Sequence, residues 1–376
     1  MKIDKITLHC IKLNMRIPLE ISYGVFADRE IILACVTTTD GVCGYGESVA
    51  YPGIMSGMET NLTNVAVMEE LLIPMLFAAG DIEHPDQVSE RIFAPLDGNP
   101  RAKATLENAV WDAYCKTNGI SVSRALGGTQ KKIACGVSVG IKPSIDALME
   151  ALAVDMPLGF QRIKLKVKHG WDIDVIRRVR EAYPDMIITV DANGAYEPKD
   201  LEHLRQFDQF DLAMIEQPYK GCYLAEMAEL QKQLNTPICL DESIESFYDC
   251  KRAVDMGSCR IINIKQGRNG GLTESRKIHD YCQQHGVALW CGGMLECGVG
   301  IGAQLAIASL PGFTLPADIF SSYYWFGNDD VIEPFIYMDE QGYIKVEDDV
   351  PGIGSFTLDQ QRFWRAHQWS KSYTAK

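Results

Sequence analysis

Apolar and polar residues alternate with a strand-like period of two over the first part of the chain, and the period becomes helical after Pro52-Gly53. The alternation predicts strands at Ile3–Leu13 and Glu30–Thr38. A turn is predicted after the second strand, at Asp40-Gly41. The later spacing predicts helices at Thr60–Phe77, His84–Phe93 and Arg101–Thr117. Strands followed by helices indicate an α+β domain, which we assign to residues 1–130 and expect to cap the remainder of the protein.

From residue 131 onwards, short apolar runs alternate regularly with amphipathic stretches. The apolar runs predict eight strands: Ile133–Val139, Arg162–Val167, Ile187–Asp191, Ala213–Glu216, Ile238–Asp241, Ile261–Lys265, Ala288–Trp290 and Phe313–Pro316. The stretches between them predict helices, among them Asp172–Ala182, Leu224–Leu234, Ser246–Met256, Leu272–His285 and Gly298–Ser309. Crossovers of this length join parallel strands, and eight such units close into a barrel.

The pattern therefore predicts an α/β fold, a (β/α)8 barrel of the modified TIM type in residues 131–320 beneath an α+β capping domain. An open doubly wound sheet is the rival, and it is weakened because no Gly-x-Gly-x-x-Gly follows the first strand of this region. Residues 321–376 leave the pattern, with a strand pair predicted over Val331–Val346 and a short helix or irregular segment over Gln360–Trp369. We expect this part to return to the capping domain.

Composition narrows the classes of protein to consider. The net charge of −14 disfavours a nucleic-acid partner, and 47% hydrophobic with 23% charged residues is ordinary for a globular chain. The start has no signal-peptide core, and Val65–Gly80 carries Glu69 and Glu70, so we expect no membrane partner and a cytoplasmic location. The twelve cysteines include no Cys-x-x-Cys pair, and those in apolar runs, such as Cys35, are expected to be reduced and buried.

Three carboxylates end successive predicted strands at the same spacing. Asp191, Glu216 and Asp241 follow one another at 25-residue intervals, about the length of one strand–helix unit. They should therefore lie side by side at the carboxyl ends of the strands, where barrel enzymes carry their functional groups. Because buried carboxylates repel each other, this arrangement predicts a site for a hard divalent cation, Mg²⁺ with Mn²⁺ as the alternative.

Lysines end the predicted strands on either side of these carboxylates. Lys164 and Lys166 alternate on one strand and so share its inward face, and Lys265 ends another strand across the barrel mouth. A nearby cation should lower the pKa of such a lysine and suit it to act as a general base. Lys168 is expected to be an ordinary surface lysine.

These parts together predict proton-transfer chemistry on a small carboxylate substrate. The metal would stabilise the enediolate that forms when the α-proton leaves. A lysine on each face would allow racemisation, and a β-leaving group would divert the same intermediate to elimination or cycloisomerisation.

The motifs resemble those of the enolase superfamily and, within it, the muconate-lactonising branch. The marks of that branch are Lys-x-Lys at 164–166 and Lys265, whereas the seventh strand, ALWCGG, lacks the histidine of the mandelate racemase branch. The chain is most similar to the o-succinylbenzoate synthase / N-succinylamino acid racemase family, in motifs spread over nearly its whole length. They are YGVFADREIIL, GYGESVAYP, AKATLENAVWDAY, IKLKVKHGWD, VDAN, IEQP, LDES, NIKQGRNGG, WCGGMLECGVG and ASLPGF.

The resemblance implies a role for each matching residue. Lys166 would be the base on one face of the substrate, Lys265 the acid/base on the other, and Lys164 an electrostatic helper that lowers the pKa of Lys166. The metal ligands would be the three strand-end carboxylates, oriented with the lysines by a second shell of Asn193 and Glu242. It also implies a homo-oligomer and a loop around Ile21–Arg29 that closes over the substrate.

Three departures from the family pattern leave the substrate open. Gln266 stands where proline is usual, an arginine is usual near Ile301, and Phe320 lies in a segment that usually carries serines and an arginine. We expect o-succinylbenzoate synthesis by dehydration, N-acylamino acid racemisation or both, with muconate cycloisomerase third. A dipeptide epimerase would need a second aspartate two residues after Asp318. A barrel that lost catalysis and a zinc hydrolase are disfavoured, because all five metal and lysine positions are filled and no histidine ends a strand.

Overall fold

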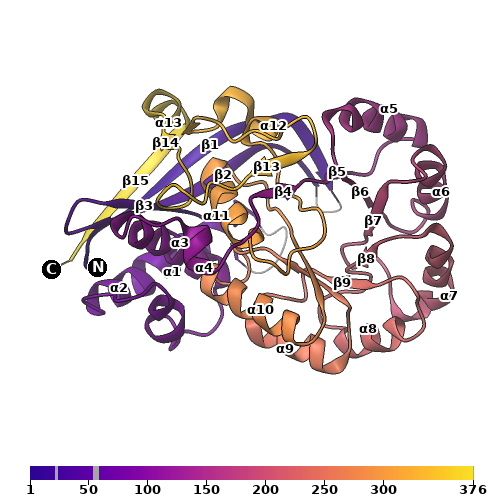
Figure 1. Ribbon diagram of the computed structural model, residues 1–376, viewed down its shortest axis with the longest axis horizontal. Coiled ribbons are helices and arrows are strands. Elements are labelled where there is room, and N and C mark those ends of the chain that lie inside the picture. Colours follow the sequence, from indigo (N-terminus) through magenta and orange to yellow (C-terminus); the bar gives the residue numbers. More distant parts are fainter. Residues whose placement is uncertain (22–23, 54–58, 376) are drawn as a thin grey trace.

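The computed structural model describes residues 1–21, 24–53 and 59–375, and it divides into a sheet-and-helix part that holds both termini and a barrel-shaped part (Figure 1). The first part contains an antiparallel sheet in the order β15-β1-β2-β3. Its strands are β1 (Ile3–Ile21), β2 (Gly24–Thr38), β3 (Cys43–Glu47) and β15 (His367–Thr374). The last strand of the chain thus pairs with the first, at Lys5 opposite Thr374.

Helices pack on this sheet and bury its apolar face. They are α1 (Asn61–Val67), the π-helical turn η1 (Met68–Leu72), α2 (Ile73–Ala78), η2 (Val88–Ile92) and α3 (Pro100–Thr117), whereas the next helix, α4 (Val122–Leu126), packs against α3 and α11. The continuous stretch Asn61–Ala78 is long and apolar enough to cross a membrane by length and composition. Its residues Met68, Leu72 and Leu76 are buried with Ile6 of β1, so in this structure it is a core helix of the capping part.

The barrel is built on a parallel sheet in the order β11-β10-β9-β8-β7-β6-β5. Its strands are β5 (Val137–Val139), β6 (Arg162–Lys166), β7 (Ile187–Asp191), β8 (Met214–Glu216), β9 (Ile238–Leu240), β10 (Ile261–Ile264) and β11 (Ala288–Cys291). The α-helices that follow them are α5 (Ile145–Asp155), α6 (Ile173–Ala182), α7 (Leu201–Leu204), α8 (Leu224–Gln231), α9 (Phe247–Met256), α10 (Leu272–Gln284) and α11 (Gly298–Ala308). Figure 1 shows α5 to α10 as an arc outside the strands, so the predicted barrel with a capping part is confirmed.

The eighth strand predicted at Phe313–Pro316 is reduced to two single bridges. Phe313 pairs with Leu289 of β11, and Ala317 pairs with Cys135 just before β5. The backbone N–H of Gly136 donates to the carbonyl of Ala317 at 2.8 Å, so the segment still closes the barrel between its first and last strands. Pro316 has no N–H to donate, which accounts for the lack of a continuous ladder.

Two further predictions are wrong about which segments pair with each other. Ile133–Val139 is not one strand, because β4 (Lys132–Ala134) pairs with β13 (Tyr343–Lys345) and only β5 joins the barrel. Val331–Val346 is not a regular strand pair, since β12 (Ile332–Glu333) pairs with β14 (Thr357–Leu358) and only a single antiparallel bridge, Met338 with Ile344, lies within the stretch. The remaining helices of the C-terminal part are α12 (Ser322–Phe326) and α13 (Gln360–Ala366).

One cysteine prediction is also wrong. Cys35 of β2 forms a disulfide with Cys43 of β3 instead of remaining a reduced thiol. The free cysteines are buried as expected, except for Cys222, which is exposed.

Two buried glutamates of the capping part hold the barrel beneath it. Glu107 of α3 accepts hydrogen bonds from the backbone N–H groups of Leu272 and Thr273 at the start of α10. Glu47 of β3 accepts from the N–H groups of Cys297 and Gly300 at the start of α11. These helices receive no capping bond from the side chain of their own N-cap residue, so the glutamates satisfy N–H groups that would otherwise be unpaired.

The segment Ile21–Arg29, expected to close over a substrate, falls partly outside the described residues. Its last residue is held firmly in the described part. The Arg29 side chain is buried, with its guanidinium 3.9 Å from the centre of the Tyr51 ring. It donates to the carbonyls of Val49 and Ala50 in the capping part at 3.1 and 2.7 Å.

Candidate active site

The register of the barrel sheet places the predicted site residues at one level. Lys166 of β6 pairs with Asp191 of β7, and Asp191 pairs with Glu216 of β8. The predicted third carboxylate, Asp241, lies one residue beyond the end of β9, and Lys265 lies one residue beyond the end of β10. All five therefore lie at the carboxyl ends of their strands, the end at which barrel enzymes carry their chemistry.

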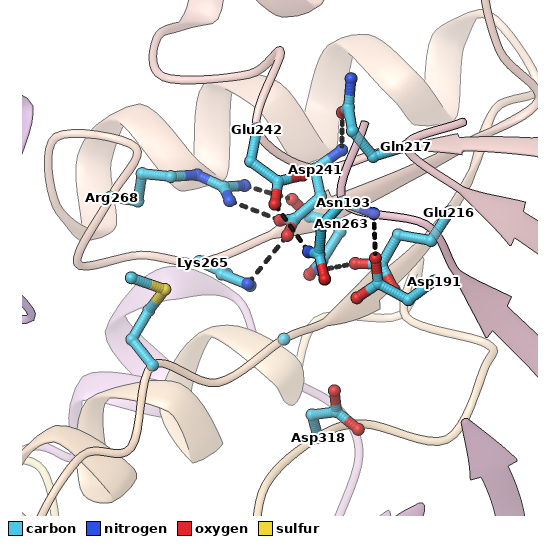
Figure 2. A network of polar contacts seen from close by, with 12 residues as sticks. Asp191, Asn193, Glu216, Gln217, Asp241, Glu242, Asn263, Lys265, Arg268 and Asp318 are labelled. Carbon is cyan, nitrogen blue, oxygen red and sulfur yellow. Dashed lines mark hydrogen bonds and ion pairs between the residues drawn. The ribbon is translucent and has the colours of Figure 1, made fainter. Parts of the chain in front are cut away.

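The three carboxylates are buried and face a common space (Figure 2). A lysine ammonium lies between two of them, because Nζ of Lys164 is 3.6 Å from Asp191 and 3.3 Å from Glu216. Nζ of Lys265 lies 2.9 Å from the third, Asp241. Each buried carboxylate at the mouth of the barrel therefore has a lysine ammonium beside it.

Burial and neighbouring charges move the pKa values of these acids in different directions. Burial, together with the charge of Asp191, raises the pKa of Glu216 to about 8. Burial also opposes ionisation of Asp191, but Lys166 and Lys164 outweigh it and lower the pKa of Asp191. The pKa of Asp241 is held well below its usual range, because Arg268 and Lys265 outweigh the effect of burial.

The lysines make separate contacts with the carboxylates. Nζ of Lys166 donates to Asp191 at 2.6 Å and to Oδ1 of Asn193 at 2.8 Å. The expectation that a bound cation lowers the pKa of a site lysine stays a prediction. Burial would lower the pKa of Lys265, but the adjacent carboxylate of Asp241 outweighs burial and raises it.

Asn193 and Glu242 connect the two sides of the site. The Asn193 side chain accepts from Lys166 and donates to Oε1 of Glu242 at 2.8 Å. Its backbone N–H donates to Oδ1 of Asp191 at 3.0 Å, and its φ of 45° bends the chain back over the strand end. Asn193 therefore couples the position of a lysine to that of two acids.

Four further residues shape the site without having been predicted as site residues. Arg268 contacts Oδ1 of Asp241, and Asn263 donates to Oε1 of Glu216 at 2.8 Å. Gln217 accepts the backbone N–H of Asp241 at 3.0 Å, and Asp318 lies 2.5 Å from Nζ of Lys164. Three of them stand in quoted motifs: NIKQGRNGG contains Asn263 and Arg268, and IEQP contains Gln217. Their closeness in the sequence to the predicted ligands and lysines could have indicated that they belong to the site.

The three departures from the family pattern are all buried. The side chain of Gln266 accepts a hydrogen bond from Asn108 of α3, so it joins the barrel to the capping part. Ile301 lies within α11, and Phe320 stacks on Tyr324 with the rings 23° apart. The aromatic run Tyr323–Phe326 thus packs within the protein.

The donor set fits a hard divalent cation. Asp191, Glu216 and Asp241 offer only oxygen atoms, and their convergence in a buried space calls for compensating positive charge. Two further buried oxygens nearby, Oε2 of Glu242 and Oδ1 of Asn263, accept no hydrogen bond. Oxygen-only donors with spare acceptor capacity are the environment that Mg²⁺ prefers.

Comparison with known proteins places this arrangement in a family. The model "Mandelate racemase / muconate lactonizing enzyme, N-terminal domain" matches residues 4–127, and "Enolase C-terminal domain-like" matches residues 147–361. The chain is 46% identical over 372 residues to o-succinylbenzoate synthase of Geobacillus kaustophilus, covering 99% of this chain and 97% of the relative. It is 39% identical over 355 residues to N-succinylamino acid racemase of an Amycolatopsis species, covering 94% of this chain and 95% of the relative.

A solved structure agrees over the full length. A member of the enolase superfamily from Listeria innocua is 35% identical to this chain and covers 100% of both chains with a TM-score of 0.96. The two family models and the full-length relatives support the same conclusion. The chain belongs to the enolase superfamily, in its mandelate racemase / muconate lactonizing enzyme family.

Proposed function

We propose that this enzyme removes the α-proton of a small carboxylate substrate to form an enediolate, in o-succinylbenzoate synthesis by dehydration, N-acylamino acid racemisation, or both. Full-length relatives carry both of these names. The two reactions share their first step, so a single site can serve both.

The observation that carries the proposal is the placement of two lysines around one set of acids. Lys166 ends β6 and Lys265 follows β10, with three strands between them. Each amine contacts a different buried carboxylate, Asp191 for Lys166 and Asp241 for Lys265. A substrate in this space would have one amine on each face, so one lysine can take a proton and the other can return one.

The same carboxylates are the proposed ligands of Mg²⁺, with Mn²⁺ as the alternative ion. Asp191, Glu216 and Asp241 would hold the ion, and Asn193 and Glu242 would orient ligands and lysines around it. When bound, the ion would offset the negative charge that develops on the substrate carboxylate as the α-proton leaves. The oxygen-only donor set supports this choice of metal.

Lys164 has an electrostatic role in this scheme. Burial would lower its pKa, but Asp318, Glu216 and Asp191 outweigh burial and hold the pKa of Lys164 well above its usual range. A lysine that keeps its proton is a poor base, but it stabilises negative charge on a nearby substrate. The roles of base are assigned to Lys166 and Lys265 by their positions on opposite sides of the carboxylates.

The contacts of Asp318 favour acyl substrates over dipeptides. Its carboxylate contacts the buried side chains of Arg162 and Lys164 and also accepts from the hydroxyl of Ser138 at 3.0 Å. Its charge is therefore matched within the protein, and little remains to recognise a substrate ammonium. The dipeptide epimerase activity therefore ranks below the two proposed reactions.

Proton exchange in D₂O tests the proposal directly. The Mg²⁺-loaded enzyme would be incubated with separate L- and D-enantiomers of N-acylamino acids and dipeptides, and in parallel with the precursor acid of o-succinylbenzoate. NMR would follow α-proton exchange and dehydration. We expect exchange of both enantiomers of an N-acylamino acid, dehydration of the precursor acid, or both, and loss of activity after treatment with EDTA.

Single-lysine variants separate the two faces. Lys166→Ala and Lys265→Ala should each abolish racemisation, and each should retain exchange for only one enantiomer, opposite in the two variants. Lys168→Ala is the matched control, since this exposed lysine ends no barrel strand and should keep wild-type rates. Equal loss of exchange for both enantiomers in both variants would contradict a one-lysine-per-face mechanism.

A further inference from the structure

A second group of metal-ligand side chains lies outside the carboxylate site. His169 is in the turn after β6, Asp172 is the N-cap residue of α6, and His203 is in α7. One ligand atom from each residue lies within 4.8 Å of those of the other two. We propose that these three residues bind a transition-metal ion of the Zn²⁺ type, separately from the proposed Mg²⁺ site.

The two inner ligands are already held toward each other. Nε2 of His203 lies 2.7 Å from Oδ2 of Asp172, whose side chain is 7% exposed. The other carboxylate oxygen accepts the N–H of Ile173, and the Tyr196 hydroxyl donates to Oδ2 at 2.9 Å. Such bonds from neighbouring groups orient a carboxylate, as they do for ligands in established metal sites.

The third ligand is placed where it can complete the group. The His169 side chain is 53% exposed and packs against Tyr196, with ring centroids 4.8 Å apart. Its Nε2 lies 3.1 Å from Oδ2 of Asp200, and Asp200 is itself held by the N–H of Glu197 at 2.8 Å. Metal-binding histidines commonly use one ring nitrogen for the ion and the other for a carboxylate, and Asp200 supplies that carboxylate.

The donor set selects the type of ion. Two imidazoles and one carboxylate suit Zn²⁺, Co²⁺ or Cu²⁺, whereas Mg²⁺ prefers oxygen donors alone. A tetrahedral zinc site requires ligand atoms about 3.3 Å apart, given bonds of about 2.0–2.2 Å. The ligand atoms lie within 4.8 Å of one another, with His203 and Asp172 in direct contact at 2.7 Å, so binding would replace that contact by bonds to the ion and draw in the exposed His169 ring, with water as the fourth ligand.

Binding would tie together three segments of the barrel rim. The ligands come from the turn after β6, the N-cap residue of α6 and the body of α7. That turn directly follows the strand that carries Lys164 and Lys166. An ion that binds the folded chain and not the unfolded one raises the melting temperature, so the site should stabilise this rim.

Zinc content in the presence of excess Mg²⁺ tests the proposal. EDTA-treated enzyme would be dialysed against micromolar Zn²⁺ with millimolar Mg²⁺, and bound zinc would be measured by mass spectrometry. We expect one zinc ion per chain and a higher melting temperature than with Mg²⁺ alone. In His169→Gln the bound zinc and the rise in melting temperature should both disappear. His285→Gln is the matched control, because this exposed histidine ends α10 away from the group and should leave both unchanged.

Two further measurements separate the outcomes. Cu²⁺ bound in excess Mg²⁺ should give an electron paramagnetic resonance spectrum with coupling to two nitrogens, reduced to one in His169→Gln. Asp241→Asn should keep the zinc, since it alters only the barrel carboxylates. Zinc retained in His169→Gln, or lost in Asp241→Asn, would overturn the proposal. His169 is the first choice for substitution because it is exposed, so its loss should not unfold the protein.

Discussion

Oδ2 of Asp318 lies 2.5 Å from Nζ of Lys164, and this contact joins the segment that closes the barrel to the strand that carries two of the site lysines. The other oxygen of Asp318 contacts Arg162, whose side chain is fully buried. One carboxylate therefore balances two buried cations at the base of the site. A buried charge that loses its partner is costly, because water does not replace the lost interaction.

Removing this carboxylate should destabilise the protein strongly. We expect Asp318→Ala to lower the free energy of unfolding by about 3–5 kcal/mol, because it leaves Arg162 and Lys164 buried without their shared partner. Urea titration would measure the change. Asp174→Ala is the control, since its side chain is 80% exposed and its pair with Arg177 should contribute less than about 1 kcal/mol. Similar losses in the two variants would contradict the role given to Asp318.

Gly292, just after β11, should be required for the position of Lys265. A Cβ at this residue would lie 2.6 Å from Cε of Lys265 and 2.3 Å from Oδ1 of Asn263, closer than such atoms can approach. Gly292→Ala should therefore displace both side chains and slow proton exchange on the Lys265 face by about 100-fold. The readout is the exchange rate of each enantiomer. Gly53→Ala, where the added Cβ meets nothing within 4 Å, should keep wild-type rates.

The barrel and its site were predictable because their signals are periodic. Strand-like runs at regular spacing gave seven of the eight barrel strands, and Asp191 and Glu216 pair in register as their equal spacing implied. The errors lie where local pattern does not determine the partner. Nothing in the run Ile133–Val139 indicates that its first half pairs with β13, a segment more than 200 residues away. Such pairings depend on tertiary packing and not on local propensity.

The same distinction applies to the site. Strand-end carboxylates and lysines could be proposed from position alone, whereas Arg268 and Asp318 act through contacts with Asp241 and Lys164 that only the fold brings together. The pKa of Lys265 could not be inferred either, because it depends on the balance between burial and a carboxylate 2.9 Å away. The roles of the site residues, the domain limits, the cytoplasmic location and the homo-oligomeric state stay predictions.

Glu107 should be needed to join the capping part to the barrel. It is fully buried and accepts bonds from the Leu272 and Thr273 N–H groups and from the Trp111 indole. Glu107→Ala would leave the two backbone N–H groups buried and unpaired, at a cost of about 1–3 kcal/mol for each, whereas the indole keeps its second bond to the Thr273 hydroxyl. We expect a lower melting temperature and separate unfolding of the two parts, seen as a second calorimetric transition. Glu340→Ala, at an exposed turn, should melt like the wild type. A single unshifted transition in Glu107→Ala would show that other contacts suffice.

His9 should make the stability of the sheet depend on pH. Burial of the ring, with the nearby charges of His367 and Lys5, lowers the pKa of His9 from 6.5 to about 4. The folded state therefore favours the neutral ring, whereas the unfolded chain takes up a proton near its ordinary pKa. The contribution of His9 to stability is fully present above about pH 6.5 and is lost as the pH falls through about 4.

A glutamine at this position tests that dependence, because it has no charge to gain and can still bond to Ser370, whose hydroxyl lies 2.7 Å from Nδ1 of His9. We expect His9→Gln to lose less stability than the wild type between pH 7 and pH 4, so that the two curves converge as the pH falls. Urea unfolding at a series of pH values would measure this. The comparison at pH 8 serves as the internal control, because there His9 is neutral in both states and any difference reflects packing. Curves that stay parallel from pH 8 to pH 4 would show that His9 does not couple folding to protonation.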